Sequence, residues 1–324
     1  MNAVRTGATL CAALTLVGLS ACNRQDTGSG ASGEGGCSGK TLGLAVANLQ
    51  ADFFNQIKQS VDDAAKEVGA KVQVSDAGGD AATQVNQMQD FITRQVSAII
   101  YIPAGATAAG VPVKAAKSAN IPVVAVDRNP PDEPGDTFIA TDSVAAAETL
   151  GKWAIDQVGG KGNLAILQGQ IGTTPQVDRQ TGFEKALKEA PGVKVVAEQS
   201  ADWAQDKAFS VAQDMLQANP DIDIFWGQAD AMGLGAAQAV KNGNVKQDVL
   251  IMGFDGDFAG LEAVRDGVMD ATMVQQTQKM GRMAVESACA LAAGESVPET
   301  QLQEAFLLTA KDSDKAQEYI DEHP

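Results

Sequence analysis

The runs Ala98-Ile99-Ile100-Tyr101-Ile102 and Val249-Leu250-Ile251-Met252-Gly253-Phe254 decide the fold class of this chain. Neither run alternates between polar and apolar positions, which is the pattern of strands buried on both faces. Strands of this kind belong to parallel sheets that carry helices on both sides. The two runs therefore predict an α/β protein built on parallel sheets.

The same order of strand and helix repeats along the chain from Thr41. Strands are expected at Thr41–Asn48, Lys71–Asp76, Ala98–Pro103, Pro122–Asp127, Thr137–Asp142, Asn163–Gly169, Val193–Gln199, Ile222–Gln228, Asp248–Asp255 and Ala271–Gln275. Helical patterns separate most of them, as at Phe53–Val68, Ala81–Gln95, Val144–Val158, Pro175–Ala190 and Asp206–Ala218. This alternation predicts doubly wound parallel sheets. About ten strands are too many for one such sheet, so we expect two similar lobes that meet near Thr141.

Polar side chains follow many of these strands. They are Asp127-Arg128, Gln168-Gly169, Gly227-Gln228, Asp255-Gly256 and Gln275. In doubly wound folds the ligand binds beyond the carboxyl ends of the strands. Each of these residues alone is more often a helix cap or a loop residue than part of a site. Their recurrence at the same place in both lobes favours a binding site for a hydroxylated ligand.

The first 21 residues have the pattern of an export signal. Arg5 is their only charge, and the apolar run from Ala8 to Leu19 is too short to cross a bilayer. Leu19-Ser20-Ala21-Cys22 resembles the bacterial lipobox, in which cleavage precedes the cysteine and that cysteine receives lipid. We expect a signal peptide over 1–21, a lipid on Cys22 and a flexible, Gly- and Ser-rich tether over 22–40. An ordinary secretory signal with a stray cysteine is the alternative.

Composition excludes several classes of function. A formal net charge of −17 and the lack of any Lys/Arg cluster argue against nucleic acid binding. His323 is the single histidine, which disfavours His-based catalysis and His-ligated metals. Met232–Ala237 imitates part of a dinucleotide fingerprint without its acidic partner. No cofactor, no metal and no enzymatic activity are expected, and from Thr41 onward no stretch is long and apolar enough to span a membrane.

Several segments resemble the ribose/galactose-type periplasmic sugar-binding proteins of ABC transporters. They are Leu44–Asn48 with Phe53-Phe54, Ile121–Arg128, Ile139–Asp142, Gly182-Phe183, Gly253–Gly256 and Ala271-Thr272 ahead of Gln275. The resemblance implies a type I periplasmic binding protein with three hinge crossings, near Thr141–Asp142, Gln275–Gln276 and Glu304–Phe306. The N-terminal lobe would comprise 41–141 plus 276–304, and the C-terminal lobe 142–275 plus 305–324. The ligand would lie between the lobes.

The resemblance also implies roles for individual residues. Phe53, Phe54 and Trp203 would stack on the C–H faces of a sugar. Asp127 and Arg128 would accept and donate hydrogen bonds to its hydroxyl groups, with Asp255 as the acceptor from the second lobe. Gln275 at the hinge would both donate and accept. The residues that would partly substitute for polar residues that this chain lacks at neighbouring positions are Asn48, Asp52, Gln176, Arg179 and Gln228.

Four of those positions depart from the family pattern. Ala51, Ile102, Val177 and Ala229 stand where the family usually has polar residues that reach the sugar. An unpartnered buried hydroxyl costs about 1–3 kcal/mol, so ribose itself is expected to bind poorly. A polyol, a deoxy sugar or a modified sugar is expected instead.

An importer role implies an ABC transporter permease as partner, a membrane contact through the lipid alone, and a monomer. A sensory protein that presents a sugar-like signal to a membrane receptor would have the same fold and is the alternative function.

Two cysteines, Cys37 and Cys289, remain in the mature body, and thiols outside the cytoplasm can oxidise. Cys37 precedes the first strand and therefore lies far from the cleft. After the expected hinge crossing at Gln275, the helix over about 277–293 must run away from the cleft toward the same end. This topology predicts a disulfide between Cys37 and Cys289, with two free thiols as the alternative.

Overall fold

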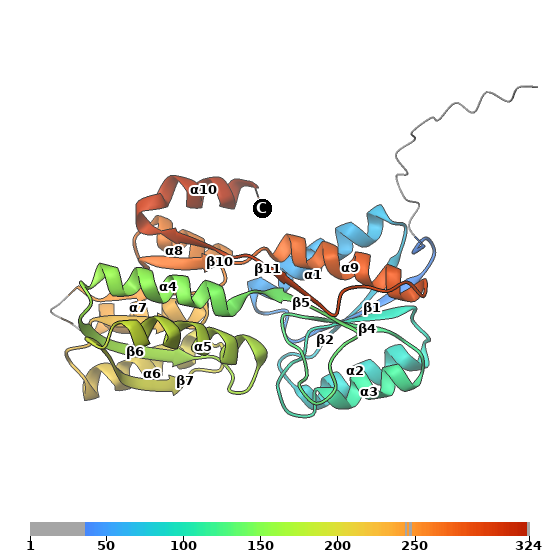
Figure 1. The fold of residues 1–324 in the computed structure, drawn as a ribbon, viewed down its shortest axis with the longest axis horizontal. Helices are drawn as coiled ribbons and strands as arrows, with labels where there is room; N and C mark the ends of the chain where they lie inside the picture. Colours follow the sequence, from blue (N-terminus) through green and yellow to red (C-terminus); the bar gives the residue numbers. More distant parts are fainter. Residues whose placement is uncertain (1–35, 244, 246–247, 323–324) are drawn as a thin grey trace, which may run out of the picture. The chain divides into compact units, whose positions relative to one another are not determined.

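A computed structural model describes residues 36–243, 245 and 248–322. The proposed signal peptide, Cys22, most of the tether and His323 lie outside these residues. Two six-stranded sheets form the body, each covered by helices on both faces, so the predicted α/β class is confirmed (Figure 1). In the described part of the chain, no helix has the length and apolarity that a membrane crossing requires.

The first sheet is entirely parallel and has the order β11-β5-β4-β3-β1-β2. Its strands are β1 (Thr41–Val46), β2 (Lys71–Asp76), β3 (Ala98–Tyr101), β4 (Val123–Val126), β5 (Thr137–Thr141) and β11 (Thr300–Gln303). Helices α1 (Asp52–Glu67) and α9 (Thr277–Ala292) pack over one face and α2 (Ala81–Thr93) and α3 (Gly110–Ser118) over the other. Within β3, Ile100 packs in the core under α1 and α9, and Ile99 packs in the core under α2 and α3. Both faces of the strand are therefore buried, which is why the run shows no alternation.

The second sheet has the order β12-β10-β9-β8-β6-β7, and only its edge strand β12 is antiparallel. Its strands are β6 (Gly162–Gln168), β7 (Val193–Ser200), β8 (Ile224–Gly227), β9 (Leu250–Met252), β10 (Ala271–Val274) and β12 (Phe306–Thr309). Helices α4 (Ser143–Gln157) and α5 (Thr174–Glu189) cover one face. On the other lie α6 (Gln205–Ala218), α7 (Asp230–Asn242) and α8 (Phe258–Arg265). Phe183 of α5 stacks on Trp226 of β8 with ring centroids 4.0 Å apart.

The described chain passes between the sheets three times. It leaves the first sheet after β5, returns after β10 into α9, and leaves again between β11 and β12. The short helix η1 (Ala310–Asp312) and α10 (Ser313–Glu322) follow, and α10 packs beside α8. The expectation of about ten strands is corrected: the described chain has twelve, and β11 and β12 are the two that were not expected. Each has only four residues and lies at a sheet edge, so neither carries a long apolar run.

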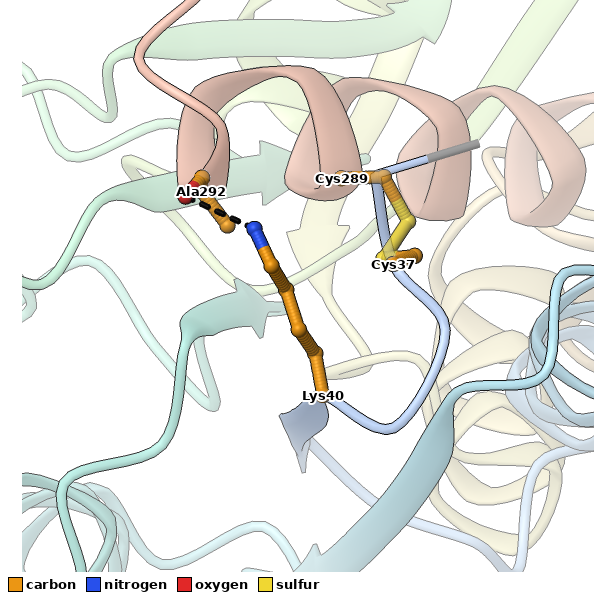
Figure 2. Close-up of a disulfide and its surroundings, with 4 residues drawn as sticks. All are labelled: Cys37, Lys40, Cys289 and Ala292. Atoms are coloured by element: carbon orange, nitrogen blue, oxygen red, sulfur yellow. Dashed lines mark hydrogen bonds between the residues drawn. A yellow bond between two sulfur atoms is a disulfide. The ribbon is translucent and has the colours of Figure 1, made fainter. Parts of the chain in front are cut away.

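Cys37 and Cys289 form a disulfide (Figure 2). Their Cα atoms are 5.2 Å apart and 252 residues separate them in the sequence. The bond ties the segment before β1 to α9, beside a hydrogen bond of 2.8 Å from Lys40 Nζ to the Ala292 carbonyl oxygen. Both contacts join the start of the described chain to the helix that enters after the second crossing.

We expect Cys37→Ala/Cys289→Ala to lower the free energy of unfolding by about 2–5 kcal/mol, because the disulfide restricts a long loop in the unfolded chain. Urea denaturation of oxidised wild type and double variant measures the difference. Wild type in reductant is the control and should match the variant. Equal stability of oxidised wild type and variant would contradict a stabilising bridge.

Candidate functional site

The carboxyl end of β4 carries a buried ion pair. Asp127 and Arg128 follow the strand directly, and their side chains are 7% and 8% exposed. The Arg128 Nε atom lies 3.4 Å from Asp127 Oδ2, and Arg128 Nη1 donates to the Pro103 carbonyl oxygen at 3.0 Å. The end of the neighbouring strand β3 thus fixes the guanidinium that β4 presents.

A second ion pair lies at the carboxyl edge of the other sheet. Arg179 of α5 contacts Asp255, which follows β9, with 3.1 Å between Nη2 and Oδ1. Arg179 Nη1 also donates to the Gln228 carbonyl oxygen after β8. Asp255 Oδ1 accepts a further hydrogen bond of 2.7 Å from the Gln275 amide. Gln228 therefore holds the guanidinium of this pair and Gln275 holds its carboxylate, although both are far from Arg179 in sequence.

Aromatic rings surround these ion pairs. Phe53 and Phe54 are buried at the start of α1, with their centroids 5.3 Å apart. The Arg128 guanidinium lies 5.3 Å from the Phe54 ring centroid and 5.8 Å from that of Trp203. Trp203 has a φ of 66°, and its ring occupies the space that a Cβ on Gly169 would need. A glycine after β6 therefore lets the indole approach the site.

One cavity of about 220 Å³ brings these side chains together. Seven of the eight predicted ligand residues line it: Phe53, Phe54, Asp127, Arg128, Arg179, Trp203 and Asp255. The eighth, Gln275, does not line it. Its amide oxygen instead accepts a hydrogen bond of 2.6 Å from Thr141 of the first sheet, so Gln275 connects β5 to Asp255.

For two of the four apolar residues that were expected to face the ligand, the expectation is wrong. Ile102 is fully buried in the core of the first sheet, and Val177 is 47% exposed on the outside of α5. Neither lines the cavity, whereas Ala51 and Ala229 do. Position along the chain alone did not distinguish a strand-end residue that faces the cavity from one that faces the core.

The cavity also includes residues that sequence reasoning missed: Gln50, Pro175, Gln205, Leu234 and Asp257. Asp257 follows Asp255 by two positions, so proximity to that motif was the available signal. Asp52, expected as a substitute polar residue, lines the cavity too. Asp257 Oδ1 accepts a hydrogen bond of 2.7 Å from Gly260 N and caps α8.

Asp230 positions the loop that carries Asp255 and Asp257. It is fully buried at the first residue of α7. Its Oδ2 accepts hydrogen bonds from Gly256 N and Asp257 N at 2.7 and 3.2 Å, and its Oδ1 accepts one of 2.6 Å from Thr272 Oγ1. This carboxylate was overlooked because it is adjacent to the glycine-containing run that imitates a nucleotide fingerprint.

Burial controls the protonation of the cavity. It raises the pKa of Asp127, against the lowering effect of Arg128 and Arg179, and it lowers the pKa of Arg128. Burial raises the pKa of Asp255 to about 7 and that of Asp257 to about 6. Buried Asp230 has its pKa raised well above the ordinary value. Among the described residues, no group of three or more His, Cys, Asp and Glu is placed to hold a metal ion.

Two helix-covered sheets with a polar cavity at their strand ends define a class, the two-lobed α/β binding proteins. The family model of the periplasmic binding protein domain matches residues 42–296. This chain belongs to that family.

Two relatives and one solved structure extend the comparison. The ribose import binding protein of Bacillus subtilis is 32% identical over 260 residues, which are 80% of this chain and 84% of the relative. A xylitol-binding protein of Mycolicibacterium smegmatis is 32% identical over 319 residues, 98% of this chain and 88% of the relative. An ABC transporter solute binding protein from Bacillus halodurans, solved with bound myo-inositol, has a TM-score of 0.81 and 26% identity. That alignment covers 88% of this chain and 98% of the other.

The raised pKa of Asp255 gives stability a pH dependence of defined sign. Between about pH 4 and 7 the folded protein holds a proton that the unfolded chain has released, so the free energy of unfolding falls as pH rises. We expect the ligand-free protein to be less stable at about pH 7.5 than at about pH 5.5, and Asp255→Asn to remove part of this slope. Denaturant titrations between about pH 5.5 and 7.5 measure how the free energy of unfolding changes with pH.

Asp312→Asn is the matched control, because a hydrogen bond from Lys315 lowers the pKa of Asp312 and that carboxyl is ionised in both states over this range. Its slope should equal that of the wild type. An unchanged slope in Asp255→Asn would contradict the raised pKa of that carboxyl.

Proposed function

We propose that this chain is the substrate-binding lipoprotein of an ABC importer, and that it captures a sugar or sugar-like polyol in the cavity. The observation that carries the proposal is the composition of that cavity: two buried guanidinium–carboxylate pairs beside aromatic rings from α1 and from the segment between β7 and α6. The chemistry of the named relatives, which include ribose- and xylitol-binding proteins, supports the same ligand class.

The cavity offers a polyol both kinds of contact that it requires. Ring faces pack against C–H groups, while carboxylates accept and guanidiniums donate hydrogen bonds to hydroxyl groups. Arg179 Nε is buried without a hydrogen-bond partner among the described residues, whereas Arg128 Nε faces Asp127 Oδ2 at 3.4 Å. The cavity of about 220 Å³ is smaller than the usual range for drug-sized ligands, which suits a monosaccharide-sized ligand.

Capture would depend on movement between two lobes, 41–141 plus 276–304 and 142–275 plus 305–324. Asp127, Arg128 and the phenylalanine pair belong to the first lobe, whereas Arg179, Trp203 and Asp255 belong to the second. A ligand that contacts both sets stabilises the closed arrangement by its differential affinity. The closed form would deliver the ligand to the permease.

Asp127→Ala, Arg128→Ala and Asp255→Ala should each weaken ligand binding by about 2–4 kcal/mol, because each leaves a buried partner unsatisfied. Calorimetry against a panel containing D-ribose, xylitol and myo-inositol gives the affinities, and circular dichroism checks the fold. Asp312→Asn, outside the cavity, is the control and should bind like wild type. Wild-type affinity in all three cavity variants would place the site elsewhere.

Lipid attachment at Cys22 has a separate test. Cys22→Ser removes the acceptor thiol, so the variant should leave the membrane fraction and appear in the soluble fraction. Cys11→Ser is the matched control, since Cys11 lies within the proposed signal, and it should stay with the membrane. Unchanged fractionation of Cys22→Ser would refute the anchor.

A further inference from the structure

The cavity contains more carboxylates than guanidiniums. Its charged lining residues are Asp52, Asp127, Asp255 and Asp257 against Arg128 and Arg179. Asp127 pairs with Arg128 and Asp255 pairs with Arg179, at 3.4 and 3.1 Å. Neither Asp52 nor Asp257 has a cationic partner among the described residues. With every group ionised, the lining therefore has an excess of two negative charges.

The two unpaired carboxylates come from opposite sides of the cavity. Asp52 opens α1 beside the first sheet and is exposed, while Asp257 precedes α8 beside the second and is half-buried. Repulsion from Asp52 adds to burial in raising the pKa of Asp257 to about 6. A neutral ligand that brings the two sides together leaves this repulsion uncompensated.

Structural roles account for only part of this charge. Asp257 Oδ1 caps α8, but Asp257 Oδ2 accepts no hydrogen bond within the described residues. Asp52 stands in the first turn of α1, where the helix dipole favours a carboxylate, yet its side chain makes no hydrogen bond in the part of the chain that the structure describes. At Asp257 an asparagine keeps the helix cap and removes the charge. At Asp52 an asparagine removes the charge together with its favourable interaction with the helix dipole.

Another cavity atom points to a ligand independently of the acids. Arg179 is 2% exposed, lines the cavity, and leaves its Nε atom without a hydrogen-bond partner in the described structure. A hydroxyl oxygen is an acceptor of the kind that this atom lacks. The lining thus has a donor for a hydroxyl group on one part of a ligand and surplus carboxylates for another part.

We propose that the ligand is a polyol or sugar bearing a protonated amine, whose ammonium lies between Asp52 and Asp257 while its hydroxyl groups contact the two ion pairs. This inference rests on the proposed function and specifies its ligand class. An ammonium supplies three donors and a full positive charge, so it satisfies both carboxylates at once.

The test compares ligands that differ only in charge. Calorimetry measures the affinity of D-glucose against D-glucosamine, D-galactose against D-galactosamine, and myo-inositol against an inositol with one hydroxyl replaced by an amine. At least one amine should bind roughly tenfold or more tightly than its neutral parent at low salt, and the gap should narrow in high salt. The N-acetyl derivative of that amine should lose the advantage.

Variants assign the preference to the two carboxylates. Asp52→Asn and Asp257→Asn should each reduce the ratio of amine to neutral affinity by several fold, and the double variant should remove it. Asp314→Asn, in the exposed first turn of α10, is the matched control and should keep the wild-type ratio.

The outcomes separate this inference from the proposed function. If a neutral sugar or polyol binds as tightly as its amine, the amine inference is wrong and the sugar-binding function stands. If amines are preferred but both Asn variants keep the preference, the placement of the ammonium is wrong. If no sugar, polyol or amine in the panel binds, both proposals fail.

Discussion

Parallel strands all end at the same edge of a sheet, and this constraint assembles the site. β4 presents Asp127 and Arg128 at the edge of the first sheet, and the segment after β9 presents Asp255 at the edge of the second. Helices return the chain between strands, so residues far apart in sequence reach one edge without any local motif. The cavity exists because both edges contribute to its lining.

Burying charges at those edges has an energetic cost that the surroundings must offset. Each guanidinium lies beside one carboxylate, and backbone carbonyls at strand ends take further donors from Arg128 and Arg179. Such pairs rarely stabilise a fold by themselves, since desolvation cancels most of the attraction. Their value is to hold donors and acceptors in place before a ligand arrives. The raised pKa of Asp255 reflects this cost, because burial disfavours the ionised form of the carboxyl.

The connections between the two sheets are themselves part of the site. Gln275 receives the Thr141 hydroxyl on one side and donates to Asp255 on the other. A displacement of Thr141 relative to Gln275 would therefore alter the hydrogen bond that positions the Asp255 carboxylate. The disulfide lies elsewhere, between the segment before β1 and α9, and neither of its cysteines lines the cavity. The bridge can therefore stabilise the fold without contacting a ligand in the cavity.

The sequence alone determined the fold class and ten of the twelve strands in the described chain, because long apolar runs are local patterns. The polar residues that end those runs include Asp127, Arg128 and Asp255 of the cavity, whereas the family resemblance supplied Phe53, Phe54, Arg179 and Trp203. The sequence did not reveal the edge strands β11 and β12, whose four-residue lengths leave no such pattern. Only the tertiary structure placed Ile102 in the core, Val177 outside and Gln275 between the sheets. It alone identified Asp257 and the buried Asp230. Which way a side chain faces depends on packing against residues that are distant in sequence, and that information is absent from any short stretch of the chain.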